Sequence, residues 1–281
     1  MNGNILLNSD SQYRSLFEDP KEKLITLAHL FDAVLKSSLV SNIQEILKQP
    51  LPVRVLIEGS TFPRNIDVVK TWLQKRKNPK DSIVLIDVSP VSIKSHKDHC
   101  EDGRYSNVKI LQGDMNAIPL GSNSIDVVIN DCAVNFNQTN KDNERTLTEI
   151  GRVLKHNESS FSLFTVAVDK KYDGIKYGED QELVPLKAVG IPGSFTSFKT
   201  REDGSIELIQ GTERKCWSVK YYEDLFGRCG FNYVKFDVET GKKYFPKESG
   251  LSFRRYVLTK KRGKSIFVGK ISRIKMPTNL F

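Results

Sequence analysis

The sequence lacks the features that mark membrane and secreted proteins. No apolar run approaches the roughly 20 residues that a membrane helix needs. The first ten residues, MNGNILLNSD, have neither the basic start nor the long apolar stretch of a signal peptide. The four cysteines are scattered and form no CxxC pair, as expected of reduced thiols. These absences predict a cytoplasmic protein with no membrane contact and no disulfides.

Acidic residues are missing from the C-terminal end of the chain. From Arg254 to the last residue there are nine Lys or Arg and no Asp or Glu, so this segment accounts for the whole net charge of +9. Two interpretations remain open. The basic tail can bind an anionic partner or substrate, or its lysines can protect a solvated edge strand from pairing with other chains.

The order of strand-like and helix-like segments predicts the fold. The 281 residues are 38% hydrophobic and 27% charged, which suits one large α/β domain, with or without a cap. Short continuous runs of Val, Ile and Leu alternate with helix-like segments, as in a parallel sheet covered on both faces. These runs are VRVLIE (53–58), SIVLIDV (82–88), NVKILQGD (107–114), IDVVINDC (125–132) and FSLFTVAV (161–168).

This order divides the chain into five segments. Apolar residues recur at helical spacing between residues 11 and 49. Glycines and prolines interrupt the pattern between residues 169 and 216, where a lid or an inserted hairpin is expected. We therefore predict a helical cap (1–50), a Rossmann-like core (51–170), a substrate-side insertion or lid (171–216), the C-terminal part of the core (217–262) and a basic tail or extra strand (263–281).

Acidic residues recur where the predicted strands end. Glu58, Asp87, Asp114 and Asp131 each follow an apolar run, and the carboxyl ends of parallel strands meet at one edge of the sheet, where ligands bind. Clustered carboxylates are unfavourable unless they meet cations or hydrogen-bond donors. A ligand with ribose hydroxyls, an adenine amine and an ammonium group would satisfy them.

At these residues the sequence resembles the class I S-adenosylmethionine-dependent methyltransferases. The segment VKILQGDMNAIPLGSNSIDVVIND, followed by ERTLTEIGRVLK, is similar to the GD…LP…FD.V and E..RVLKPGG pattern of the small-molecule, type 11-like branch. The resemblance covers about residues 50–170 and 217–260. It implies a doubly wound, mostly parallel seven-stranded sheet with an antiparallel C-terminal hairpin, and S-adenosylmethionine as cofactor.

The resemblance also implies the roles of individual residues. Asp87 would accept hydrogen bonds from the ribose hydroxyls, or alternatively cap a helix. Asp114 would accept from the adenine amine and Met115 would donate its N–H to the ring, although Asp114 can also form an Asx turn. The cofactor-binding residues it implies are Glu58, Gly59, Ser60, Asp87, Val88, Asp114, Met115 and Asn130.

The glycine turn after the first strand departs from the family pattern. The family commonly has an acid followed by alternating glycines, whereas this chain has Glu58-Gly59-Ser60-Thr61-Phe62-Pro63. We expect a stiffer turn that still meets the methionine end of the cofactor. The alternative is a purely structural turn with Pro63 at a helix start. Because GxGxxG is absent, a nicotinamide dehydrogenase is disfavoured.

The acceptor side is predicted from the loop after the fourth strand. Asp131 is the candidate general base, and Asn135 and Asn137 are candidates for orienting a small-molecule substrate. Nucleic-acid methylation through the basic tail is one alternative, although Asn130-Asp131-Cys132-Ala133 lacks the Pro-Pro-aromatic run of amino-methylating enzymes. A cofactor-binding protein without catalysis is another.

Two further clusters are predicted to have structural roles. His96 and His99 are expected on a solvated helix face rather than at a metal site. Trp217, Tyr221 and Tyr222 have the spacing of a helix that packs into the core.

Overall fold

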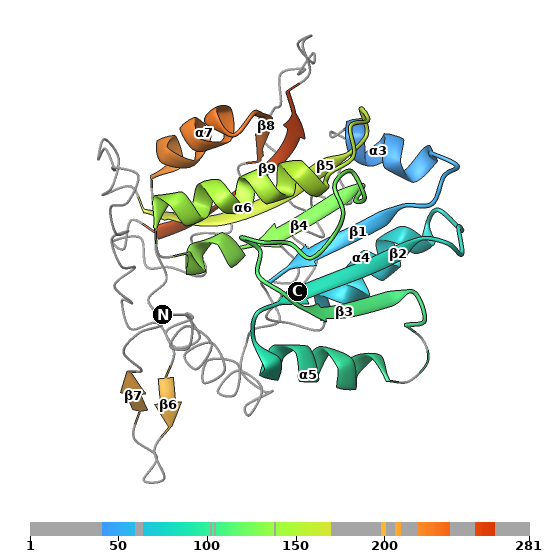
Figure 1. Cartoon of the computed structure of the whole chain (residues 1–281), viewed down its shortest axis with the longest axis horizontal. Helices are drawn as coiled ribbons and strands as arrows, with labels where there is room; N and C mark the ends of the chain where they lie inside the picture. Colours follow the sequence, from blue (N-terminus) through green and yellow to red (C-terminus); the bar gives the residue numbers. More distant parts are fainter. Residues whose placement is uncertain are drawn as a thin grey trace, which may run out of the picture.

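The computed structural model of the chain is an α/β domain built on one large sheet (Figure 1). It describes residues 41–59, 64–101, 103, 105–137, 139–169, 198–200, 206–208, 218–236 and 251–261. Most of the predicted cap and lid, Ser60, Trp217 and the predicted tail from residue 263 onward lie outside the described residues.

The large sheet has seven strands in the order β3-β2-β1-β4-β5-β9-β8. Neighbouring strands are parallel from β3 to β5, whereas β9 runs antiparallel to both β5 and β8. The predicted doubly wound sheet with an antiparallel C-terminal hairpin is therefore confirmed. The strands are β1 (Arg54–Glu58), β2 (Ser82–Asp87), β3 (Val108–Gln112), β4 (Val127–Asp131), β5 (Phe161–Asp169), β8 (Phe231–Phe236) and β9 (Leu251–Lys260).

Helices cover both faces of the sheet (Figure 1). Alternate residues of β1, β2 and β4 pack in a core with α3, α4 and α5, and the residues between them pack in a second core with α6 and α7. This alternation explains why the strands are apolar at every position. The helices are α3 (Ser41–Lys48), α4 (Arg64–Gln74), α5 (Pro90–Cys100), α6 (Asn140–Val153) and α7 (Val219–Arg228), with a short 3-10 helix η2 (Ala133–Phe136) after β4.

Local sequence signals explain where the helices begin. The Ser89 side chain accepts from Ser92 N at the start of α5, whose first residue is Pro90. Thr139 and Asp142 form a reciprocal capping box at the start of α6. Each cap satisfies backbone N–H groups that have no partner inside the helix.

Two short strands, β6 (Phe198–Thr200) and β7 (Ile206–Leu208), pair antiparallel in the segment where the sequence predicts a lid or an inserted hairpin. The antiparallel pairing of these two strands is that of a hairpin. Almost all other residues of the segment lie outside the described residues.

His96 does not lie on a solvated face. Its side chain is fully buried, and Nδ1 lies 2.6 Å from the carbonyl oxygen of Ser92. His99 is partly exposed and contacts the Asp67 carboxylate, with Nε2 3.2 Å from Oδ2. The prediction of a solvated face was therefore wrong for His96, because its turn of α5 packs against the sheet.

The core position predicted for the aromatic pair of α7 is confirmed. Tyr222 is fully buried and stacks on Phe226, and Tyr221 contacts Tyr222 edge to face.

Part of the basic C-terminal segment belongs to the sheet. Arg255 in β9 is 1% exposed. Lys260 Nζ donates to the Leu154 carbonyl at the end of α6 (2.6 Å), and Lys261 Nζ donates to the Gly227 carbonyl in the last turn of α7 (2.9 Å). Both lysines donate to carbonyls near helix ends, and Lys260 is partly buried whereas Lys261 is exposed.

Candidate functional site

Strand register sets the positions of the predicted site residues at the carboxyl ends of the strands. Glu58 of β1 lies level with Asn130 of β4, and Asp87 of β2 lies level with Gln112 of β3. Side chains two residues apart on a strand point to the same face of the sheet. Glu58 and Asn130 therefore lie on the face covered by α6, where Leu56 and Val128 pack. Asp87 lies on the face covered by α4, where Leu85 packs. The acids therefore meet at one edge but approach it from two faces.

Glu58 is a buried carboxyl that is only half satisfied. It is 1% exposed, and Oε2 accepts from Asn130 Nδ2 at 2.9 Å. Its other oxygen, Oε1, has no hydrogen-bond partner among the residues that the structure describes. Burial raises the pKa of Glu58 to about 8, and the charges of Glu149 and Asp114 act in the same direction. A cation or a donor placed at Oε1 would remove this penalty.

Gly59 forms the turn that follows Glu58. Its φ is +56°, and a Cβ built on it would lie 2.7 Å from the Cβ of Ala133. Both the backbone conformation and the close approach of the loop after β4 require glycine here. Only this first residue of the altered turn can be described, since residues 60–63 lie outside the described ranges.

Cys132, which follows β4, also has a left-handed backbone. Its φ is +61°, and it precedes η2, whose first three residues are buried. A non-glycine residue in this conformation is uncommon and costs on the order of 1 kcal/mol. Together with Gly59 it brings the loops after β1 and β4 into contact.

Asp87 is buried and takes part in the turn that starts α5. Oδ1 accepts from Ser89 N at 2.9 Å, and Oδ2 accepts from the Ser92 hydroxyl at 3.0 Å. Ser89, rather than Asp87, is the N-cap residue. These two bonds orient the Asp87 carboxylate. The neighbouring Val88 carbonyl accepts from Gln112 Nε2.

Asp114 is exposed and forms an Asx turn after β3. Oδ1 accepts from Asn116 N at 2.8 Å, and the Asp114 carbonyl accepts from Ala117 N. Oδ2 accepts no hydrogen bond from a described residue, so the turn orients the carboxylate and leaves one oxygen available. The Met115 sulfur lies 3.9 Å from Asn130 Nδ2, which brings this turn to the Glu58–Asn130 pair.

The three residues predicted on the acceptor side have different surroundings. Asp131 lies half-buried at the end of β4, level with Thr165. Asn135 is buried, and its amide exchanges two hydrogen bonds with the backbone of Ala167 in β5. Asn137 is buried in a polar network with Asn116 and α6. The structure therefore gives both asparagines structural contacts, and their substrate roles stay predictions.

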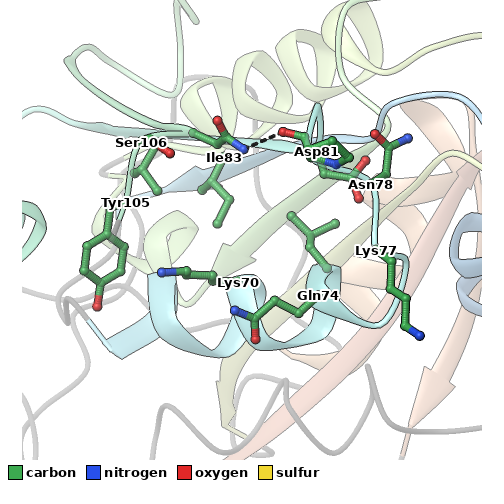
Figure 2. A pocket seen from close by; sticks show the side chains of 12 residues that line it. Lys70, Gln74, Lys77, Asn78, Asp81, Ile83, Tyr105 and Ser106 are labelled. Carbon is green, nitrogen blue, oxygen red and sulfur yellow. Dashed lines mark hydrogen bonds between the residues drawn. The ribbon is translucent and has the colours of Figure 1, made fainter. Parts of the chain in front are cut away.

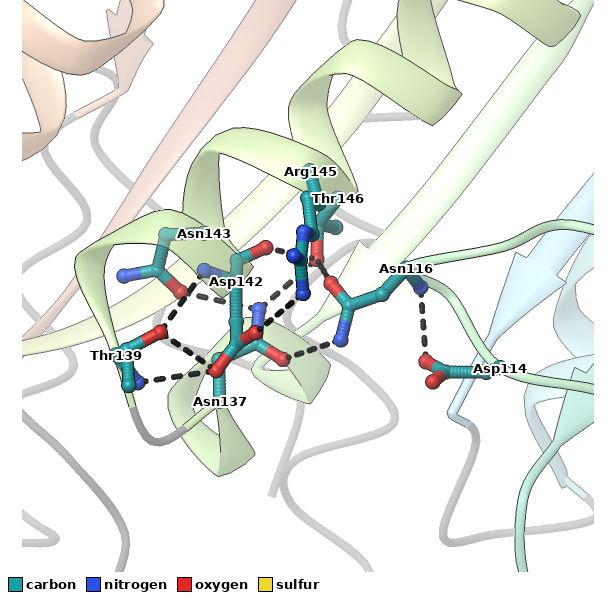
Figure 3. A network of polar contacts seen from close by, with 8 residues as sticks. All are labelled: Asp114, Asn116, Asn137, Thr139, Asp142, Asn143, Arg145 and Thr146. Atoms are coloured by element: carbon teal, nitrogen blue, oxygen red, sulfur yellow. Dashed lines mark hydrogen bonds and ion pairs between the residues drawn. The ribbon is translucent and has the colours of Figure 1, made fainter. Parts of the chain in front are cut away.

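The sequence reasoning missed the part that α6 plays in holding the loop after β3. Thr146 donates to Asn116 Oδ1 at 2.7 Å, Glu149 Oε2 accepts from Ile118 N at 2.8 Å, and Arg152 donates to the Ile118 and Leu120 carbonyls (Figure 3 shows the Thr146 end). The spacing of Thr146, Glu149 and Arg152 on one helix face is the sequence signal that would have indicated this contact.

Buried acids at the opposite edge were also missed. Asp81 and Asp126 precede β2 and β4, and both accept from backbone N–H groups at the start of β1, those of Val53 and Arg54. Each carboxylate also meets a cation, Asp81 with Arg76 and Asp126 with Lys155. These acids are structural.

A cavity of about 320 Å³ lies at this same amino edge, between α4 and the starts of β2 and β3 (Figure 2). Its wall includes Ile83 and Val108, which are the first residues of the β2–β3 register, and the side chains of Lys70 and Gln74. The cavity is therefore remote from the carboxyl ends where Glu58 and Asp87 lie.

No three His, Cys, Asp or Glu side chains within the described ranges are grouped so that they could hold a metal ion. Among the helices that the structure describes, none has the length and apolar character needed to cross a membrane.

Comparison with known proteins identifies the fold and the domain. Residues 70–171 match a family model described as a methyltransferase domain. A SAM-dependent methyltransferase from Methanosarcina mazei is similar in structure with a TM-score of 0.50 and 13% identity, over 78% of this chain and 96% of that one. The N-terminal domain of EvdMO1, solved with SAH bound, has a TM-score of 0.52 and 12% identity, over 76% of each chain.

The residues at the carboxyl edge fit S-adenosylmethionine. One buried oxygen of Glu58 has no hydrogen-bond partner among the described residues. The turn at Gly59 packs closely against Ala133. Asp114 has one carboxylate oxygen that accepts no bond from a described residue. These features lie on a seven-stranded sheet that ends in an antiparallel pair of strands, β9 and β8, as the sequence resemblance implies. Residues 70–171 therefore match a methyltransferase domain, and the sheet that carries them has the fold of the S-adenosylmethionine-dependent methyltransferase from Methanosarcina mazei.

Proposed function

We propose that the protein transfers the methyl group of S-adenosylmethionine to a small-molecule acceptor. The observation that carries the proposal is the half-satisfied, buried Glu58 at the carboxyl end of β1. A buried carboxyl without a cation is unfavourable, and the methionine end of this cofactor has an ammonium group. When bound, the cofactor supplies a methyl group on a positively charged sulfonium.

The other residues at this edge orient the cofactor. Asp87, held by Ser89 and Ser92, is positioned to accept from ribose hydroxyls. Asp114 is positioned to accept from the adenine amine through the oxygen that its Asx turn leaves available. Alignment of this kind is the main contribution that an enzyme makes to an in-line displacement, where effects of about 7–11 kcal/mol are attainable.

Asp131 is the proposed general base, because it lies at the end of the central strand β4 and beside the left-handed turn at Cys132. A carboxylate there would accept a proton from an acceptor hydroxyl or amine. The acceptor atom itself is set by the segments that would cover this edge.

The contacts of the basic residues favour a small molecule over a nucleic acid. Arg255 is buried, and Lys260 and Lys261 donate to carbonyls at helix ends. Phosphate binding requires cations that are free to meet it at the surface. Within the described part of the basic segment, Arg255 is buried and Lys260 is partly buried, which supports the small-molecule acceptor.

Calorimetric titration with S-adenosylhomocysteine tests the cofactor site. We expect binding to the wild type and at least about tenfold weaker binding to Asp87→Asn, because a charged acceptor of ribose hydroxyls is lost. Asp98→Asn is the matched control, since Asp98 lies on the exposed side of α5 and pairs with Lys94. No binding to the wild type at millimolar ligand would defeat the proposal.

Release of S-adenosylhomocysteine from S-adenosylmethionine then tests the acceptor class. We expect turnover with one or more members of a small-molecule library and none with RNA. Turnover with RNA alone would establish the nucleic-acid alternative, and binding of cofactor without turnover on either class would support a non-catalytic role.

A further inference from the structure

A chain of neutral side chains joins the turn at Asp114 to helices α6 and α7. Asn116 Nδ2 donates to Asn137 Oδ1 (3.1 Å), and Asn137 Nδ2 donates to Asn143 Oδ1 (3.1 Å) (Figure 3). Asn143 Nδ2 continues the chain to the hydroxyl of Tyr221 in α7 (3.2 Å). Asn143 is fully buried and Asn137 nearly so. Loss of any one of these hydrogen bonds would therefore leave a buried polar group without a partner and destabilise the fold.

Thr146 closes the network at the end nearest Asp114. Its hydroxyl donates to Asn116 Oδ1 at 2.7 Å and accepts from Asn137 Nδ2 at 2.9 Å. The side chain of Asn116 is thus fixed at both ends of its amide, by Asn137 and by Thr146. Thr146 itself is fully buried on the rigid α6.

The backbone of Asn116 transmits this restraint to Asp114. Asn116 N donates to Asp114 Oδ1, which sets the plane of the carboxylate and leaves Oδ2 as the available acceptor. Asp114 is exposed, and no described residue other than Asn116 bonds its side chain. The orientation of Asp114 therefore depends on where the side chain of Asn116 is held.

We propose that Thr146 and Asn116 are positioning residues that give the site its preference for a 6-aminopurine. They act through Asp114, whose fixed Oδ2 accepts from the exocyclic amine. This inference rests on the proposed function, in which Asp114 meets the adenine. A site that holds a hydrogen-bond acceptor in a defined place rejects an analogue that lacks the donor, whereas a freely rotating carboxylate meets water equally well and discriminates less.

The test compares the affinity of two ligands for each variant by calorimetry. One ligand is S-adenosylhomocysteine, and the other is its analogue with hydrogen in place of the 6-amino group. The ratio of the two dissociation constants is the readout, because a general loss of stability or of site shape weakens both ligands alike. We expect the wild type to prefer the amino form by about tenfold, and Thr146→Val to lower that preference to about threefold or less.

Thr148→Val is the matched control. Thr148 lies on the exposed side of the same helix, and its hydroxyl donates to the Glu144 carbonyl and to no residue of the Asn116 network. We expect Thr148→Val to keep the wild-type ratio and Thr146→Ser, which retains the hydroxyl, to restore it. Thermal melting of each variant shows whether it is folded before the ratio is measured. If Thr146→Val does not fold, Asn116→Ala, which removes the side chain that Thr146 holds, replaces it and should lower the preference in the same way.

The outcomes separate this inference from the proposed function. An unchanged ratio in Thr146→Val, or a wild type that binds both ligands equally, would overturn the positioning role while leaving cofactor binding intact. A loss of the preference in Thr146→Ser as well would also overturn it, since the hydroxyl would then not be the cause. If the wild type binds neither ligand, the proposed function itself fails and the inference fails with it.

Discussion

Glu58 at the carboxyl edge of the central sheet differs from the buried carboxylates at the amino edge. At the amino edge, Asp81 and Asp126 are each bonded to a backbone N–H of β1 and to a cation. At the carboxyl edge, Glu58 is equally buried but meets only the amide of Asn130, and one of its oxygens has no partner among the described residues. An uncompensated buried carboxyl is therefore a candidate position for a ligand that supplies a donor or a cation.

The comparison also shows that a cavity alone is a poor guide to this site. The cavity of about 320 Å³ lies at the amino edge, where the acids are already paired. The carboxyl edge has the unfavourable electrostatics instead. The chemical groups left unsatisfied there, rather than the shape of this cavity, support the proposal that the cofactor binds at the carboxyl edge.

Removing a paired carboxylate at the amino edge should have the largest effect on the free energy of unfolding. Asp126→Ala removes two bonds to Lys155 Nζ, at 2.9 and 2.8 Å, and leaves Arg54 N without its acceptor. We expect the free energy of unfolding to fall by about 3–4 kcal/mol, measured by urea denaturation. Asp98→Ala, which breaks an exposed pair with Lys94, should cost less than about 0.5 kcal/mol. Equal effects of the two variants would contradict the structural role of Asp126.

The buried Glu58 at the carboxyl edge should make the free energy of unfolding depend on pH. The pKa of Glu58 in the folded protein is raised to about 8, above that of an unfolded glutamate. Its contribution to stability is therefore fully present below about pH 4 and is lost as the pH rises through about 8. Relative to Glu58→Gln, the wild type should lose on the order of 3 kcal/mol between about pH 5 and pH 9.

Denaturation of both proteins at a series of pH values measures this difference. Parallel pH profiles for the wild type and Glu58→Gln would show that Glu58 ionises normally and would remove the contrast between the two edges. Bound S-adenosylhomocysteine should flatten the wild-type profile, because its ammonium group favours the charged carboxylate.

The turn at Gly59 should be sensitive to a single methyl group. Gly59→Ala places a Cβ 2.7 Å from that of Ala133 and forces alanine into φ +56°. We expect a loss of about 2 kcal/mol in unfolding free energy and weaker binding of S-adenosylhomocysteine. Gly121→Ala is the control, since a Cβ there meets nothing within 4 Å, and it should change stability by less than about 0.5 kcal/mol. A neutral Gly59→Ala would contradict the close approach of the two loops.

The smallest effect is expected where β9 meets the end of α6 at the amino edge. Lys260→Met removes the bond from Nζ to the Leu154 carbonyl, and burial already lowers the pKa of this lysine. We expect a loss of about 1 kcal/mol in thermal or urea unfolding. Lys220→Met, which affects only an exposed pair with Asp224, should be close to neutral. A larger effect of Lys220→Met would show that surface charge, rather than the helix end, is responsible.

The strands of the parallel part of the sheet were predictable because their sequences are continuous apolar runs. Runs such as IVLI in β2 and VVI in β4 are apolar at every position, which only a strand buried on both faces requires. The positions of Glu58 and Asp87 at strand ends followed directly. The burial of His96 could not be predicted, because α5 has a polar sequence and its inward face depends on how the helix packs on the sheet.

The contacts that complete the site involve residues far apart in the chain. Glu58 and Asn130 are 72 residues apart, and Asn143 and Tyr221 are 78 apart. Asn135 and Asn137 looked like substrate contacts because they follow a strand end, yet their amides are bonded to Ala167, Asn143 and Thr146. The sequence of a loop shows which polar side chains it contains, but not which of them form hydrogen bonds within the folded protein.

The amino-acid sequence by itself determined the alternating strands and helices and the acid at each strand end, because apolar runs and turn residues act locally. Only the tertiary structure decided which acids are compensated. Register pairs Glu58 with a neutral amide and leaves Lys155 to Asp126, and the balance of charge around a buried carboxylate depends on neighbours that the chain brings together only when it folds.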